Sequence, residues 1–243
     1  MAHYVLNNAK LWVDGYDFSG DSNALAINYA ADEVEDTHFG DSTHIFLGGL
    51  LNFDAQFEGA IELGTATVEG LNFANVGTKN TPFTFGLDTG ADGEIGYTME
   101  ALTAAFNWGA TIGEMQTYSV SLAASGNRLV RGTIMHNATR TSTANGTARQ
   151  LGAVAAGQSV YATLHVLATV SGTNPTLDVV VASAATDSWP GTSRITFSRK
   201  TALGSQFATP VAGAITDTWW RVQYTIGGTD TPTFPFIVII GIV

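Results

Sequence analysis

The densest group of side chains that could bind a metal or move a proton lies between residues 36 and 44. Asp36-Thr-His-Phe-Gly-Asp-Ser-Thr-His44 holds two His and two Asp within nine residues. Imidazole and carboxylate groups are ligands for divalent metals, and both can act as general acids or bases. The spacing fits no zinc pattern, and no motif elsewhere supplies a fourth ligand. We therefore interpret the segment as a polar loop between strands and expect no metal or other cofactor.

Other candidate chemistry in the sequence is sparse. Asp88-Thr-Gly-Ala-Asp-Gly-Glu94 has the composition of a calcium loop without its ligand spacing, and Asp and Gly are also the residues that turns require. His165 stands in an apolar run, which favours a hydrogen-bonded core residue. The chain has no Cys, no Gly-x-Ser-x-Gly elbow and no phosphate-binding Gly-Lys-Ser/Thr loop. Nothing in the sequence argues for an enzyme.

Charge is divided unevenly along the chain. Residues 1–127 hold 17 of the 21 acidic side chains but only two of the ten basic ones, whereas residues 128–243 carry a net charge of +4. Solubility does not require acid to be segregated, but a surface that repels a passing polyanion does. A chain of 243 residues, 45% of them apolar, is long enough for two β-rich modules. We expect one of them to have a negative surface.

No secretion signal or membrane span is visible. The N-terminal residues lack a basic region followed by an apolar one. The most hydrophobic segment, Phe234–Val243, has about half of the ~20 residues that a membrane helix needs, and its β-branched content predicts a buried strand instead. We expect synthesis in the cytoplasm and no membrane partner.

Apolar and polar residues alternate most regularly from Asn52 to Glu62, which predicts a half-buried strand. The inward face would carry Phe53, Ala55, Phe57, Gly59 and Ile61, and the outward, anionic face Asp54, Glu58 and Glu62. Residues 114–122 predict a second such strand. Thr67–Val76 is typical of a short helix, with Thr67 as its N-cap and Gly77 as its stop.

The composition from Thr139 to Thr147 is typical of a linker, so we expect one β domain at residues 1–140 and another at 141–243. Strand patterns follow at residues 159–169, 176–182, 193–198, 218–226 and 236–243. Their spacing is typical of a β-sandwich, and the fold class is all-β with one short helix. Trp219 and Trp220 must point to opposite faces of a strand. One would be core, and the other could stack on a sugar or a partner protein.

Three segments resemble the major tail (tail tube) proteins of long-tailed bacteriophages: Val13-Asp-Gly-Tyr-Asp-Phe-Ser-Gly20, Asp36-Thr-His-Phe-Gly-Asp41 and Gly48-Gly-Leu-Leu-Asn-Phe-Asp-Ala-Gln-Phe-Glu-Gly59. In that family an Asp-Thr-Thr-x-Gly-Asp-like loop precedes a Gly-Leu-x-Asp turn and a strand that lines the tube. Here His38 replaces the usual Thr, and Asn52 stands near the usual Asp. Rear segments at 164–166, 171–179 and 225–234 resemble β-sandwich appendages of phage virion proteins.

The resemblance implies a homo-hexameric ring that stacks into the hollow tube of a virion tail, with strands from six subunits closing one barrel. The partners would be further copies of the chain and other phage tail proteins, and genomic DNA would pass through without specific binding. Asp54, Glu58 and Glu62 would line the channel, and the second β-sandwich would lie outside.

The segment from Ala31 to Gly49 mixes acidic with apolar residues and would be costly to order as a loop on an isolated subunit. We expect it to make inter-subunit contacts through Asp36, Phe39, Asp41, Ile45, Phe46 and Leu47. Two other classes of function stay open. A capsid decoration protein would use the same sandwich as trimers, with no reason to segregate acid. A carbohydrate-binding or hydrolytic tail module would use an aromatic and acidic cleft.

Overall fold

A computed structural model describes residues 6–64, 66–167 and 170–243 of the chain. The described residues form many strands and one short helix, which confirms the expected all-β class. They divide into two compact units. The hairpin unit comprises residues 21–81 and 100–129, and the sandwich unit comprises residues 1–20, 82–99 and 130–243. No helix among the described residues is long and apolar enough to cross a membrane.

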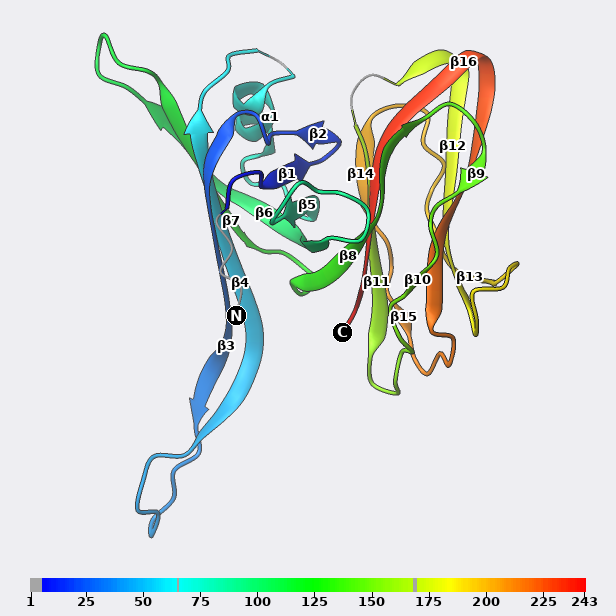
Figure 1. The fold of residues 1–243 in the computed structure, drawn as a ribbon. Coiled ribbons are helices and arrows are strands. Elements are labelled where there is room, and N and C mark those ends of the chain that lie inside the picture. Colours follow the sequence, from blue (N-terminus) through cyan, green and yellow to red (C-terminus); the bar gives the residue numbers. More distant parts are fainter. Residues whose placement is uncertain (1–5, 65, 168–169) are drawn as a thin grey trace. The chain divides into compact units, whose positions relative to one another are not determined.

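The hairpin unit is built on an antiparallel sheet (Figure 1). In spatial order its strands are β3 (Ser22–Glu35), β4 (Phe46–Ala60), β7 (Thr117–Ala124) and the second half of β6 (Ile95–Gly109). β4 pairs with β7 only from residue 54 to residue 60, and its preceding residues pair with β3 alone. β3 and β4 therefore leave the sheet as a two-stranded ribbon.

The alternation predicted for β4 is confirmed. Phe53, Ala55 and Phe57 are buried, with Phe57 0% exposed, while Asp54 and Glu58 between them are exposed. The strand ends at Ala60, so Ile61 and Glu62 lie beyond it, and Ile61 is half-buried. β7 starts later than the predicted 114–122 but buries Tyr118, Val120 and Leu122 on one face as expected.

The helix α1 (Val68–Asn75) begins and ends close to its predicted bounds. Thr67 is the N-cap residue by position, but its hydroxyl donates to the carbonyl of Gly64 and not to the helix. Gly77 follows the last turn with a φ of 83°, a conformation that suits glycine. An eight-residue helix is stable only when packed against a sheet.

The sandwich unit holds the remaining strands. They are β1 (Lys10–Val13), β2 (Tyr16–Asp17), β5 (Thr81–Gly86), the first half of β6, β8 (Val130–Arg140), β9 (Ala144–Asn145), β10 (Arg149–Gln150), β11 (Ser159–Val166), β12 (Ser171–Ala184), β13 (Thr192–Thr196), β14 (Gly204–Phe207), β15 (Val211–Ala212) and β16 (Trp219–Ile242). A large apolar core joins residues of β8, β11, β12 and β16. It packs one sheet against another, as the sandwich prediction required.

β16 belongs to both sheets of the sandwich. Its first half pairs with β12 and with the short strands β9 and β10, and its second half pairs with β8 and β11. The change of direction occurs at Asp230 and Thr231, which have positive φ values of 58° and 56°. Residues 218–226 and 236–243 were expected as separate strands and are instead the two arms of this bent one.

The predicted linker and domain boundary do not match the structure. Within the predicted linker 139–147, β8 runs to Arg140 and Ala144–Asn145 forms β9. The expected division at 140/141 does not coincide with the compact units, because β8 pairs from Thr133 to Arg140 with the second half of β16. Strands on either side of the expected boundary therefore belong to one sheet.

Candidate assembly surfaces

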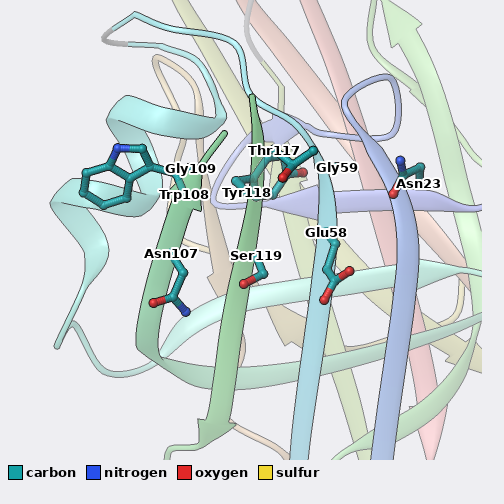
Figure 2. Close-up of a pocket in the computed structure, with 9 residues that line it drawn as sticks. All are labelled: Asn23, Glu58, Gly59, Asn107, Trp108, Gly109, Thr117, Tyr118 and Ser119. Carbon is teal, nitrogen blue, oxygen red and sulfur yellow. The ribbon is translucent and has the colours of Figure 1, made fainter. Parts of the chain in front are cut away.

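The exposed face of the hairpin unit's sheet is polar and carries two of the predicted channel residues. Glu58 lies opposite Ser119 of β7, which in turn lies opposite Asn107 of β6. These side chains line an open groove of about 470 Å³ together with Asn23 of β3 (Figure 2). Glu62, the third predicted channel residue, is exposed just after the end of β4.

Among the described residues, the acidic side chains on this face accept hydrogen bonds from amide side chains. Asn28 Nδ2 donates to Asp54 Oδ1 over 2.9 Å, and Gln56 donates to Glu58. The hairpin unit contains twelve acidic and two basic residues, against nine and eight in the sandwich unit. One of the two bases, Arg128, donates to the hydroxyl of Tyr29. Tyr29 pairs with Phe53, so both lie on the face of the sheet opposite to Asp54 and Glu58. Asp54 and Glu58 therefore give the polar face a negative charge.

Tyr118 borders this groove, and its hydroxyl holds two strands together instead of acting as an acid or base. Its hydroxyl lies 2.8 Å from Ser22 Oγ. Burial raises the pKa of Tyr118 to about 12, so the phenol stays protonated at neutral pH. The groove is lined by amide, hydroxyl and aromatic side chains with one carboxylate, Glu58, an arrangement that suits binding or lining.

The β3–β4 ribbon carries a row of large apolar side chains that the unit leaves exposed. Phe53 is the first buried residue of β4, and between it and the tip the large apolar residues of both strands are exposed, as are those of the tip. They are Tyr29, Val34, Phe39, Ile45, Phe46, Leu47, Leu50 and Leu51. Leu50 keeps 80% of its surface, and Phe39 at the tip is fully exposed. Single apolar residues are ordinary on a surface, but this many large ones on the two faces of a projecting ribbon mark an interaction site.

Almost half of the expected loop from Ala31 to Gly49 is strand. Residues 31–35 and 46–49 belong to β3 and β4, which leaves a tip of residues 36–45. Asp36, Phe39, Asp41 and Ile45 lie in this exposed tip, and Phe46 and Leu47 begin β4. Two strands of a hairpin can pair through their backbones without burying a face. The mixture of acidic and apolar residues therefore did not prevent these residues from forming strands.

The His and acidic residues of the tip hold the turn together. His44 Nδ1 lies 2.6 Å from Glu35 Oε1, and the hydrogen bond from His44, with a further one from Thr37, lowers the pKa of Glu35. The carboxylate of Asp41 accepts from the backbone N–H of His38 over 2.7 Å. In the part of the chain that the structure describes, no three His, Asp or Glu side chains gather as a metal site.

A second apolar area lies at the opposite end of the same sheet, and the sequence reasoning missed it. Phe73 of α1 contacts Trp108 of β6 edge-on, with ring centroids 6.3 Å apart. Both are exposed, as are Ile112 and Met115 in the turn between β6 and β7. Register places this turn beside residue 60 of β4, whereas the ribbon tip lies at the other end of the strands. The sequence does contain a sign of this area, because Ile112 and Met115 are large apolar residues on either side of Gly113, where a turn is expected.

His165 is a core residue, as expected. Its Nε2 lies 2.8 Å from the hydroxyl of Thr84, which donates to Thr98 over 3.1 Å. Because the Thr84 proton is used in that bond, Nε2 must carry the hydrogen, and Nδ1 is left buried without a partner among the described residues. Burial, with the charge of Lys200 as a smaller cause, lowers the pKa of His165 to about 3.

The turn Asp88–Glu94 uses its carboxylates within the sandwich unit. Glu94 accepts a hydrogen bond from the backbone N–H of Gly90 over 2.7 Å. Asp92 accepts from the backbone N–H of Asn137 over 2.6 Å, and burial raises the pKa of Asp92. The acidic residues therefore shape the turn, in line with the turn interpretation.

No protein-family model and no curated protein matches the chain. Among solved structures, a chain in the tail of an empty gene transfer agent particle with C6 symmetry is 13% identical, with a TM-score of 0.37. The match covers 45% of this chain and 80% of that one. A chain from the sheath–tube complex of an extracellular contractile injection system is 12% identical, with a TM-score of 0.41, over 52% and 88% of the two chains.

The Dit protein of phage SPP1, described as part of the hub adsorption apparatus of phages that infect Gram-positive bacteria, is 11% identical with a TM-score of 0.38. That match spans 98% of this chain and all of the Dit chain. These three structures come from a tail, a sheath–tube complex and a hub adsorption apparatus.

Proposed function

We propose that the chain is a structural protein of a phage virion, which assembles with copies of itself as stacked hexameric rings that form the tail tube. The observation that carries the proposal is the β3–β4 ribbon, whose apolar side chains lie outside any core of the hairpin unit. Burying such side chains is favourable by about 25 cal/mol per Å² of apolar area. Another subunit is the partner that an abundant, self-assembling tail protein always meets.

Open sheet edges supply the contact within a ring. β3 pairs with β4 alone, so along the described strand its outer backbone groups have no strand partner. At the other side of the sheet, the last residues of β6 pair with β7. An exposed edge recruits another strand, and edges joined between subunits close the sheet into a barrel. Six copies in a ring are what the tail-tube resemblance implies.

Stacking uses the two apolar areas at opposite ends of the sheet. The ribbon of one ring would meet the area around Trp108 and Ile112 of the next, which is a head-to-tail contact. Such a contact repeats without closing, and it therefore builds a filament. This role includes the predicted inter-subunit residues Asp36, Phe39, Asp41, Ile45, Phe46 and Leu47.

The polar face of the sheet would line the channel. Asp54 and Glu58 project from it, and Glu62 follows at the end of β4. A lumen with fixed negative charge and few bases repels phosphates, so DNA passes without binding. The sandwich unit, which holds residues 141–243, would lie on the outside of the tube, where other tail proteins could reach it. The assembled protein would be located in the virion tail.

Particle shape and a matched pair of variants test the proposal. Purified full chain should give six-fold rings or tubes in negative-stain images. Phe39→Ser with Leu50→Ser should weaken association about tenfold or more, because both side chains lose apolar area buried between subunits. Leu203→Ser is the control, since Leu203 is also exposed but belongs to the sandwich unit. Trimers would instead indicate a capsid decoration protein, and monomers at all concentrations would contradict self-assembly.

A further inference from the structure

The outer face of the sheet that holds β12, β9, β10 and the first arm of β16 carries a set of unpaired polar and aromatic side chains. Along β16, Trp220, Val222 and Tyr224 are buried, so Trp219, Arg221 and Gln223 project from the other side and are half-buried. Trp220 Nε1 donates to the carbonyl of Gly152 over 2.8 Å. The adjacent tryptophans thus divide as expected, one in the core and one on the outer face.

Arg221 is held flat against an aromatic ring. Its guanidinium carbon lies 3.9 Å from the ring centroid of Trp189, and Trp189 Nε1 donates to Asp187 Oδ1 over 3.3 Å. The stacking orients the guanidinium without using its N–H groups. Within the described residues the Arg221 guanidinium makes no hydrogen bond, and because its Nε is closed to water, its terminal N–H groups are the ones that a ligand can reach. The Arg221 guanidinium therefore has a fixed orientation and free N–H groups that can bind an anionic group.

Amide side chains surround these rings. Register places Gln150 of β10 opposite Trp219, and Asn145 of β9 opposite Gln223. Both Gln150 and Asn145 are exposed, and within the described residues their amides are outside every side-chain hydrogen bond. Two other arginines of this unit, unlike Arg221, are paired with carboxylates. Arg199 binds Asp178 through two hydrogen bonds of 2.9 and 2.8 Å, and Arg194 is paired with Asp217. Arg221, Gln150 and Asn145 therefore leave unused donors and acceptors on this face.

We propose that this face binds a saccharide chain that carries carboxylate groups. Partly exposed indole rings present flat apolar surfaces to the C–H faces of sugar rings, and amides can donate to and accept from neighbouring hydroxyls. Arg221 would take the carboxylate, because a planar guanidinium matches a carboxylate with two parallel hydrogen bonds. The sandwich unit has nine acidic and eight basic residues, so a polyanion meets little overall repulsion from it.

The test uses polygalacturonate as probe, with its methyl ester as the matched polymer without free carboxylates. Retardation of the full chain in native gels containing each polymer gives relative affinities. The wild type should bind polygalacturonate at least about tenfold more tightly than the ester, the ratio expected for losing a charge-assisted hydrogen bond. Trp219→Ala and Arg221→Gln should each weaken that binding to a similar extent.

Folding and specificity are controlled separately. Arg131→Gln, which removes an exposed cation of β8 in the other sheet of the sandwich, should bind like wild type. Arg221→Lys keeps the charge but loses the planar fork, so it should melt like wild type and still bind more weakly. Equal binding to both polymers, no binding to polygalacturonate, or unchanged binding by the Trp219 and Arg221 variants would each overturn the proposal. None of these outcomes depends on whether the chain forms tubes.

Discussion

Ser22 Oγ and Tyr118 Oη lie 2.8 Å apart and join β3 to β7 across the intervening strand β4. Gly59 of β4 stands between them, opposite Ser22 on one side and Tyr118 on the other. A Cβ at Gly59 would lie 1.8 Å from the carbonyl oxygen of Asp21, so a side chain there is excluded. The base of the ribbon is therefore fixed by a close backbone approach and a hydrogen bond.

This pair should behave as a coupled unit in unfolding experiments. Ser22→Ala and Tyr118→Phe each remove one partner of a half-buried hydrogen bond, and each should cost about 1 kcal/mol of unfolding free energy. The double variant should cost less than the two single changes together, with a coupling of about 0.5 kcal/mol or more. Urea unfolding of the four proteins measures this. Strict additivity would contradict the contact.

His165 should make the protein sensitive to mild acid. Its pKa is lowered to about 3 in the folded state, against about 6.5 when unfolded, so between these values only the unfolded chain takes up the proton. Stability is therefore lost as pH falls through this window, by about 2 kcal/mol from pH 7 to pH 5. His165→Gln, which keeps an N–H for Thr84, should remove that part of the pH dependence.

Thr84→Val is the control for this experiment. It removes the hydrogen-bond acceptor at Nε2 but leaves the buried imidazole in place. The variant should be less stable at every pH and should keep the wild-type dependence on pH. If His165→Gln instead follows the wild-type curve, the imidazole is not the group that responds.

Hydrogen exchange should separate the tip from the strands of the ribbon. In unassembled protein, amides of residues 36–45 should exchange rapidly, because few of them are hydrogen-bonded in the turn. Paired amides of residues 46–51 should be partly protected. After assembly, protection should rise over the whole ribbon while the core of the sandwich unit stays unchanged. Equal protection of the ribbon before and after assembly would show that it takes no part in subunit contacts.

Reversing the charge of the polar face should convert a passive surface into one that retains DNA. Asp54→Lys, Glu58→Lys and Glu62→Lys together should let assembled particles hold short duplex DNA at about 50 mM salt and release it at about 200 mM. DNA held in a lumen is also protected from nuclease. The triple Asn/Gln/Gln variant at these positions separates loss of negative charge from gain of positive charge. Retained DNA that stays nuclease-sensitive would place these residues on an outer wall.

Local patterns predicted the parts of the fold whose structure is decided locally. The alternation of apolar and polar residues predicted the buried face of β4, because in a strand every second side chain points to the same side and only the apolar side can face a core. The 140/141 boundary failed because β8 is completed by residues about 100 positions later, and no local composition records such pairing. The outer part of the ribbon was predicted as a loop because both its faces are exposed, so its sequence does not alternate between apolar and polar residues. The second apolar area escaped because it is assembled from a helix, a strand end and a turn.

The shared strand β16 has a consequence for how the chain folds during synthesis. β8 and β11 emerge from the ribosome well before residues 234–242, which fill the place between them. Until then both strands have unsatisfied edges, and the sandwich core lacks Phe234, Phe236, Val238 and Ile240. The sandwich unit must therefore remain open through most of translation, when unpaired edges are prone to aggregate. Its closure is a late, long-range event, and a chaperone that shields strand edges would matter most in that interval.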